Sequence, residues 1–416
     1  MFFIYQIAIL LILIFSPIIV LIRIINNKEH PIRFKEKFCF FSKKRSSGKL
    51  VWFHGASVGE ILSIIPLIEK LEKNKKISQI LITSNTLSSS KILNNLKFKK
   101  TIHQFFPIDT IYHSKKFLNY WKPTIAIFID SEIWPNMLTN IKEYSIPSIL
   151  LNARITKKSF NRWKRFLPSA KNLFKKFDIC FPSSIKSKKY LRFLGAQKIK
   201  YIGNLKFSET EKNKDYLNNS LKKNFLSRKI WCAASTHDPE EEICAQLHKR
   251  LKRKYKNLLT IVIPRHINRT QDIINKVKEL GLQIQTHDSK KKISKDTDIY
   301  LVNTYGMTKS FFKVCKIVFL GGSMIKHGGQ NPLEPARYGC KILHGPSIWN
   351  FYDIYALLNK YNVSQNVNNL NQLELHVDRI FGTKNNSKNI ESKINKLGNK
   401  ILNLTLKEVN FFIDKR

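Results

Sequence analysis

The sequence has little of what marks a disulfide-rich or zinc-binding protein. Its six cysteines are scattered over 416 residues, and none forms a Cys-x-x-Cys pair. This spacing argues against a disulfide framework or a zinc site and fits a reducing compartment. Acidic residues are also scarce, at 29 against 73 Lys and Arg. The formal charge of +44 favours polyanions as partners, but Lys, Asn and Ile are abundant throughout, so biased codon usage explains the excess equally well.

The first 22 residues contain no charged side chain. Only Gln6 and Ser16 are clearly polar, and a helix of this length reaches about 33 Å, enough to cross a hydrocarbon core of about 30 Å. No basic residue precedes the apolar run and no small-x-small site follows it, so a cleaved signal peptide is disfavoured. A basic neck at residues 23–48 follows, and the positive-inside rule places the rest of the chain in the cytoplasm. We therefore expect a single-pass transmembrane anchor at residues 1–22.

Length and pattern indicate two α/β domains. A chain of this size exceeds one ordinary core, and 43% apolar residues exclude disorder as the default. Short apolar runs alternate with helical spacing, which predicts parallel, doubly wound sheets. The strands expected in the first half are Leu50–Phe53, Ile80–Thr83, Ile125–Asp130, Ser148–Leu151, Ile179–Phe181 and Tyr201–Ile202. Those expected in the second half are Ile230–Ala233, Leu258–Ile263, Ile299–Val302, Ile317–Leu320 and Lys341–Leu343.

The predicted boundaries follow from this alternation. The N-terminal domain covers residues 49–207, and a polar, Lys/Asn-rich linker covers residues 208–229. The C-terminal domain covers residues 230–390, and an amphipathic helix at residues 391–416 ends the chain.

Two motifs of the first half follow strands and contain carboxylates. Trp52 to Glu60 reads Trp-Phe-His-Gly-Ala-Ser-Val-Gly-Glu, where glycines allow close backbone approach and Glu60 opens a helix. Ile129 to Asn136 reads Ile-Asp-Ser-Glu-Ile-Trp-Pro-Asn, with acids at the carboxyl end of a strand, where open α/β sheets bind ligands. Taken alone, either motif is also compatible with an ordinary strand–helix turn.

The second half contains turns suited to a nucleotide. Pro264-Arg265-His266 follows a predicted strand. Gly321-Gly322-Ser323 and the later His327-Gly328-Gly329-Gln330-Asn331-Pro332-Leu333-Glu334 place glycines before a helix that begins with proline. Such turns bind phosphate, and Glu334 can reach a ribose hydroxyl pair.

In this order the segments resemble the Kdo (3-deoxy-D-manno-octulosonic acid) transferase family of lipopolysaccharide synthesis, from about Arg33 to Phe351. The resemblance implies a GT-B fold of two Rossmann-like domains facing a cleft, CMP-Kdo as donor and lipid IVA as acceptor. It also implies inversion at the anomeric carbon and a place at the bacterial inner membrane, in contact with its lipids. We expect no cofactor, no metal and no nucleic-acid partner.

Individual roles come from the resemblance. Glu60 matches the general base, and Asp130 stands where relatives often have Glu, a proposed transition-state contact. Glu132 is the second acid of that motif, and Lys206 matches a cation that stabilises the transition state. The residues that match the CMP-sugar site are Pro264, Arg265, Tyr305, Gly306, Met307, Asn331, Pro332, Leu333 and Glu334.

One departure concerns the donor site. Relatives usually read Asp-Thr-x-Gly-Glu where this chain has Asn303-Thr304-Tyr305-Gly306-Met307. A carboxylate is therefore replaced by Met307, which weakens CMP binding unless backbone groups make the contact.

Two other functions remain open at this stage. A GT-B enzyme for another nucleotide sugar shares the glycine turn, and a metal-dependent one needs an Asp-x-Asp such as Asp296-Thr297-Asp298, which here precedes a strand. A non-enzymatic basic protein that binds membrane or nucleic acid explains the charge and the anchor, but not the ordered motifs.

Overall fold

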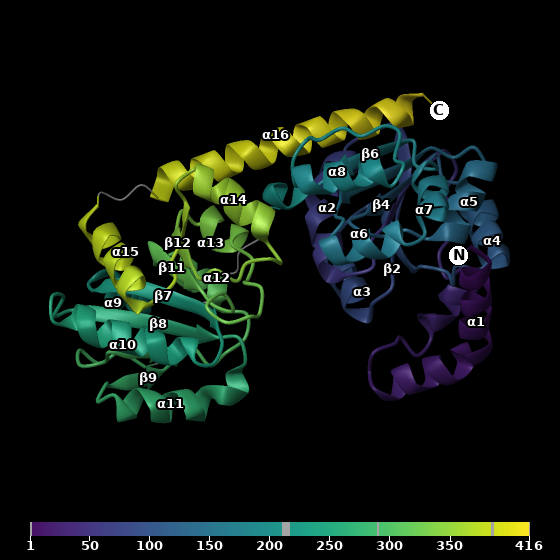
Figure 1. Ribbon diagram of the computed structural model, residues 1–416. Helices are drawn as coiled ribbons and strands as arrows, with labels where there is room; N and C mark the ends of the chain where they lie inside the picture. Colours follow the sequence, from purple (N-terminus) through teal and green to yellow (C-terminus); the bar gives the residue numbers. More distant parts are fainter. Residues whose placement is uncertain (1, 210–216, 289–290, 384–386, 416) are drawn as a thin grey trace. The chain divides into compact units, whose positions relative to one another are not determined.

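The computed structural model describes residues 2–209, 217–288, 291–383 and 387–415. The chain forms two compact units, drawn in Figure 1. Unit 1 comprises Met1–Thr210 together with Leu397–Arg416, and unit 2 comprises Glu211–Lys396.

Unit 1 contains a six-stranded parallel sheet in the order β3-β2-β1-β4-β5-β6. Its strands are β1 (Lys49–His54), β2 (Ile77–Ser84), β3 (Thr101–Phe105), β4 (Ile125–Ile129), β5 (Ser148–Ala153) and β6 (Ile179–Pro182). Its connecting helices are α2 (Val58–Leu71), α3 (Leu87–Asn94), α4 (Ile111–Trp121), α5 (Pro135–Glu143), α6 (Lys157–Lys164), α7 (Leu167–Phe174) and α8 (Ile185–Phe193), with 3₁₀ turns η1 (Arg33–Phe38) and η2 (Leu205–Ser208). The strand order reverses between β1 and β4, which defines the switch point where such sheets bind ligands.

Unit 2 contains a seven-stranded parallel sheet in the order β13-β12-β11-β7-β8-β10-β9. Its strands are β7 (Lys229–Thr236), β8 (Leu258–Pro264), β9 (Ile284–Thr286), β10 (Ile299–Leu301), β11 (Ile317–Leu320), β12 (Lys341–His344) and β13 (Ser364–Asn366). Its helices are α9 (Asn219–Leu226), α10 (Glu240–Lys252), α11 (Thr270–Glu279), α12 (Thr308–Phe312), α13 (Leu333–Arg337), α14 (Tyr352–Lys360) and α15 (Leu370–Gly382), with the 3₁₀ turn η3 (Ile267–Arg269). Here the order reverses between β7 and β11.

The predicted fold class is confirmed, because both sheets are parallel, doubly wound and flanked by helices (Figure 1). The central strands are apolar and fully buried, as β4 illustrates from Ile125 to Ile129, since helices cover both faces. The strand expected at Tyr201–Ile202 is wrong: that segment has no strand pairing, and only the nearby Ile199 forms an isolated bridge, to Cys180. Three strands that the sequence did not predict, β3, β9 and β13, contain polar residues such as His103.

The chain begins with the helix α1 (Phe2–Ile25), which is the one helix among the described residues long and apolar enough to cross a membrane. Most of its apolar side chains are exposed. Near its start the Tyr5 hydroxyl donates to Asp109 at 2.6 Å. Asp109 is buried and also accepts the backbone N–H groups of Asn136 and Met137, where α5 begins.

The chain ends with the helix α16 (Ser387–Asp414), which starts in unit 2 and finishes in unit 1. Its last turns contain the buried side chains Val409 and Ile413. Lys49 Nζ donates to the Ile413 carbonyl at 2.7 Å, and Gly203, with a φ of +111°, leaves room for Ile401. Within the segment expected as a linker, residues 210–216 lie outside the described residues and α9 occupies much of the remainder.

Candidate active site

The turn after β1 points the Glu60 carboxylate back toward its own loop. Ser57 caps α2, its hydroxyl accepting the Glu60 N–H and donating to Glu60 Oε1 at 2.9 Å. Glu60 Oε2 accepts the Ser57 N–H at 3.4 Å, which completes a capping box, and it also accepts the Ala56 N–H at 2.7 Å. A Cβ on Gly55 would lie 3.2 Å from the Glu60 Cβ, so glycine permits this close packing. A Cβ on Gly59 would meet no atom within 4 Å, so that side of the turn faces open space.

The acidic loop after β4 lies beside this turn, because β1 and β4 are neighbours at the switch point. Asp130 has a φ of +56°, an unusual conformation for a residue other than glycine and one that often marks a functional site. Its side chain is only 7% exposed and accepts a hydrogen bond from Asn152 Nδ2 at 2.8 Å. Asn152 in turn accepts the Leu205 N–H at 2.9 Å, which connects the acidic loop to η2, the turn that contains Lys206.

Glu132 is held by two aromatic donors. Trp134 Nε1 donates to Glu132 Oε2 at 2.9 Å, and His54 Nε2 lies 3.2 Å from the same oxygen. The His54 ring is fully buried, stacks on Phe106 with centroids 3.8 Å apart, and contacts Thr83 Oγ1 at 3.0 Å through Nδ1. The contact of His54 with Glu132 places this histidine beside the site.

The carboxylates of Glu60, Asp130 and Glu132 lie close enough to affect one another's charge. The pKa of Glu60 is raised to about 7, first by burial and then by the negative charges of Glu132 and Asp130. Burial also raises the pKa of Asp130, while the positive charges of Lys206 and Arg154 oppose that rise. The structure therefore brings together the four predicted residues Glu60, Asp130, Glu132 and Lys206. Sequence reasoning did not select Arg154, although it directly follows β5.

In unit 2 the glycine turn after β11 is organised by a buried carboxylate. Glu240, the first residue of α10, is fully buried and accepts the N–H groups of His237, Gly322, Ser323 and Met324 at 2.7–3.0 Å. Burial raises the pKa of Glu240, and these four bonds oppose the rise. A Cβ on Gly321 would lie 2.5 Å from the Ser235 carbonyl oxygen, so only glycine fits. Glu240 was not predicted, because a bond spanning more than 80 residues leaves no local sequence pattern.

Histidines and arginines gather at the carboxyl ends of β7 and β8 next to this turn. The His237 ring lies 4.3 Å from that of His327 and 5.5 Å from that of His266, between centroids. The pKa of His237 is lowered to about 4 by burial, then by His327 and His266, and then by the nearby Arg265 and Arg269. A region this positive at a switch point suits phosphate groups.

The other predicted donor residues are distributed more widely. Asn331 accepts the Leu333 N–H at 3.1 Å, where Pro332 precedes α13, and Glu334 lies in the first turn of that helix. Pro264 ends β8. Gly306 has a φ of +83°, and Tyr305 is 67% exposed. Met307 is buried and lines a cavity with Thr304 and His287, on the β9 side of the sheet.

In the Asp296-Thr297-Asp298 sequence, Asp298 has a structural role. Asp298 is buried before β10, contacts His248 Nε2 at 3.1 Å and forms an ion pair with Lys252, and these bonds hold its pKa well below the usual range. Across the ranges that the structure describes, no group of three or more His, Cys, Asp and Glu side chains could hold a metal ion.

Comparison with known proteins identifies similar sequences over most of the chain. Residues 32–209 match the family described as 3-deoxy-D-manno-octulosonic-acid transferase (kdotransferase). The chain is 32% identical over 353 residues to a probable mitochondrial 3-deoxy-D-manno-octulosonic acid transferase of Arabidopsis thaliana, which covers 82% of this chain and 78% of the relative. It is 33% identical over 340 residues to the 3-deoxy-D-manno-octulosonic acid transferase of Rickettsia bellii, with 81% and 80% covered.

A solved structure shares the fold. The crystal structure of a putative UDP-N-acetylglucosamine 2-epimerase from Listeria monocytogenes aligns with a TM-score of 0.57 at 13% identity, covering 86% of this chain and 95% of that one. At this identity the likeness concerns the two Rossmann-like units alone.

Proposed function

The chain belongs to the 3-deoxy-D-manno-octulosonic acid (Kdo) transferase family of glycosyltransferases, and from that membership we propose that it transfers Kdo from CMP-Kdo to the lipid A precursor lipid IVA with inversion at the anomeric carbon. The observation that carries the proposal is the group of three carboxylates at the switch point of unit 1, in which the pKa of Glu60 is raised to about 7. A carboxylate with a pKa near the working pH is suited to general-base catalysis.

In the proposed reaction Glu60 takes the proton of the acceptor hydroxyl. The hydroxyl oxygen then forms a bond to the anomeric carbon of Kdo, while the bond from that carbon to the phosphate oxygen breaks and CMP leaves with the electron pair. The open space beside Gly59 supports an acceptor approaching at this turn. The capping bonds from Ala56 and Ser57 orient the Glu60 carboxylate before substrate arrives.

Asp130, Glu132 and Lys206 complete the proposed site. The negative charges of Asp130 and Glu132 raise the pKa of Glu60, which makes it a stronger base. Lys206 is the proposed electrostatic partner for charge that develops on the departing phosphate. Its charge also acts on buried Asp130.

The CMP part of the donor is assigned to unit 2. Arg265 supplies a phosphate partner beside the glycine turn, and the positive surroundings of His237 support an anionic ligand there. The Asn331–Glu334 segment at the start of α13 is the proposed ribose contact. Met307 is buried on the β9 side, so it takes no polar part in donor binding.

The deciding experiment is incubation of the purified chain with lipid IVA and CMP-Kdo, followed by mass analysis of the lipid. We expect a mass increase of one or more Kdo residues. A parallel reaction with UDP-N-acetylglucosamine tests the other donor class. Transfer from that donor, or no change of mass with CMP-Kdo, would refute the proposed substrate.

We also propose that α1 anchors the enzyme in the bacterial inner membrane as a single pass, with both units in the cytoplasm. A helix that crosses with its start outside would separate Tyr5 from Asp109, so the span requires that hydrogen bond to open. The six native cysteines are buried, so Phe3→Cys introduces an exposed thiol. A membrane-impermeant maleimide added to intact spheroplasts should label this variant. Labelling only in inside-out vesicles would instead show that α1 stays on the cytoplasmic side.

A further inference from the structure

Unit 2 contains a cavity at the opposite end of its sheet from the glycine turn. The cavity has a volume of about 410 Å³ and lies where β11 and β12 begin, because Lys316 precedes β11 and Lys341 starts β12. The glycine turn, in contrast, follows the end of β11 at Gly321. The cavity is therefore separate from the proposed donor site.

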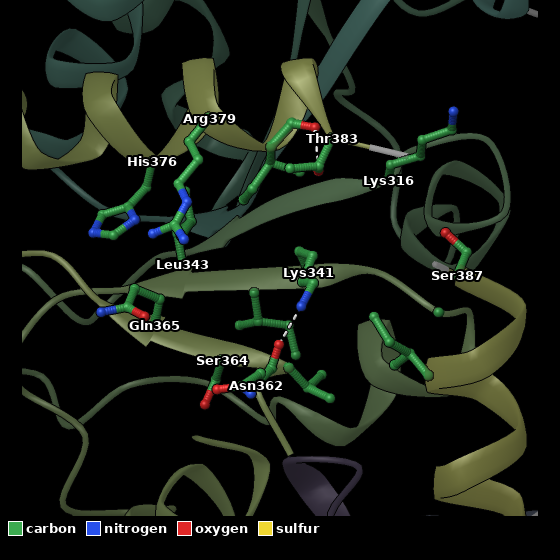
Figure 2. A pocket seen from close by; sticks show the side chains of 15 residues that line it. Lys316, Lys341, Leu343, Asn362, Ser364, Gln365, His376, Arg379, Thr383 and Ser387 are labelled. Atoms are coloured by element: carbon green, nitrogen blue, oxygen red, sulfur yellow. Dashed lines mark hydrogen bonds between the residues drawn. The ribbon is translucent and has the colours of Figure 1, made fainter. Parts of the chain in front are cut away.

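The walls combine cations with an apolar floor. Lys316, Lys341, His376 and Arg379 contribute the charge, and none of the 15 described residues that line the cavity has a carboxylate. Figure 2 shows His376 and Arg379 extending from α15 toward the strand that holds Leu343. Ile342, Val363 and Ile390 contribute apolar surface.

The helix α15 separates its charges between two faces. Its acids point to the end of α10 and the turn after it, where Glu374 pairs with Arg250 at 3.1 Å and Asp378 pairs with Lys254 at 2.8 Å. Its bases His376 and Arg379 line the cavity instead. A basic composition caused by codon usage alone does not predict this separation, since it adds lysine and arginine without regard to face.

Two titrating groups indicate a positive field that is not balanced locally. The pKa of Lys341 is lowered by burial and then by the charges of Lys393 and Arg379. The pKa of His376 is lowered by burial and then by Arg379. The Lys341 ammonium donates to the Asn362 carbonyl, a neutral partner that leaves the charge uncompensated.

We propose that this cavity is a second anion site, which binds a phosphate-bearing ligand with an organic body through Lys341 and Arg379. The phosphate would lie between the two cations and accept hydrogen bonds from both. Such charge-assisted bonds are stronger than bonds between neutral groups. The volume and the apolar floor suit the group that the phosphate esterifies. The same chemistry is offered by a soluble phosphomonoester and by an anionic lipid headgroup.

The experiment measures hydrogen exchange on the full-length chain and has two arms. In the first, protein in nonionic detergent is titrated with glycerol 3-phosphate. In the second, protein is reconstituted in nanodiscs of phosphatidylcholine with or without phosphatidylglycerol. We expect slower exchange in peptides from β12, β13 and α15 in at least one arm. Slowing in the first arm identifies a soluble ligand, and slowing only with phosphatidylglycerol identifies a headgroup.

The variant pair Lys341→Gln and Arg379→Gln should raise the ligand concentration at half-saturation at least about tenfold, because two charge-assisted hydrogen bonds are lost. The matched control pair, Arg253→Gln and Lys256→Gln, removes the same charge from exposed positions outside the cavity and should leave binding unchanged. Hydrogen exchange in peptides from β7 and β8, measured without ligand, reports whether the variants fold. If the pair disturbs them, Arg379→Gln alone is used, since that side chain is exposed.

Two results would overturn the proposal. One is an absence of slowing in both arms. The other is slowing that the Lys341 and Arg379 variants leave intact, or that the control pair abolishes to the same extent, because the ligand would then be responding to net charge alone.

Discussion

The pH dependence of transfer gives the sharpest test of the proposed base. Because the pKa of Glu60 is raised from 4.5 to about 7, about one tenth of the enzyme has an ionised base at pH 6 and about nine tenths at pH 8. Since the ionised form is the active one, kcat/KM for CMP-Kdo should rise about tenfold across this range. A Glu60 with an unperturbed pKa would give an almost flat profile, because it is ionised throughout.

Substitution assigns this pH dependence to Glu60. Glu60→Gln preserves the shape and the capping bonds but cannot accept a proton, so kcat/KM should fall by about 10²–10⁴ and the rise with pH should disappear. Glu69→Gln makes the same change on the same helix and should keep both the rate and the profile. The variant is necessary because burial raises the pKa of Asp109 to about 7 as well. His237, with a pKa lowered to about 4, titrates below the range.

The assay is initial-rate transfer to lipid IVA from pH 5.5 to pH 8.5 at constant ionic strength. A flat wild-type profile would refute the environment assigned to Glu60. A Glu60→Gln enzyme that folds and transfers Kdo at nearly the wild-type rate would remove Glu60 from the mechanism and leave Asp130 as the next candidate base.

Three further predictions follow from the same contacts. Glu132→Gln removes a charge that raises the pKa of Glu60, so the rate at pH 6 relative to pH 8 should increase; an unchanged ratio of initial rates contradicts the coupling. Between about pH 4.5 and 7 folded Glu60 retains a proton that the unfolded chain has released, so the wild type loses stability as pH rises through this window. The Tm of Glu60→Gln minus that of the wild type should therefore increase from pH 4.5 to pH 7 and then level off. A Tm difference that stays constant with pH argues against the raised pKa. Asp109→Ala leaves the N–H groups of Asn136 and Met137 buried without their acceptor, which should cost about 1–3 kcal/mol and lower the Tm, whereas Asp109→Asn, which keeps one oxygen, should cost less.

The sequence was most informative where burial dictates residue type. The run Ile317–Leu320 was predicted with the bounds that β11 has, because a strand covered on both faces must be apolar along its length. β9 and β13, at the two edges of the sheet, contain Gln285 and Gln365 and were missed, since an edge strand needs pairing on one side only. Their existence follows from tertiary pairing that local pattern does not encode.

The site shows the same division. The meeting of Glu60 with Asp130 and Glu132 could be anticipated, because their motifs follow strands and parallel strands end at one edge. The bond between His54 and Glu132, the four N–H groups gathered by Glu240 and the strength of the Glu60 perturbation could not. Each depends on side-chain distances between segments far apart in the chain.

The passage of α16 from unit 2 into unit 1 has a consequence for how the polypeptide is made. The N-terminal part of unit 1 is the first to leave the ribosome, yet the surface that Val409 and Ile413 cover in the finished fold stays open until residues 397–416 have been synthesised. The 186 intervening residues, 211–396, take about 10–40 s to synthesise at 5–20 residues per second. During that interval the N-terminal part of unit 1 lacks the packing that Val409 and Ile413 provide. Loss of the last turns of α16 is therefore expected to destabilise the unit whose first part is translated earliest, because Val409 and Ile413 are buried there.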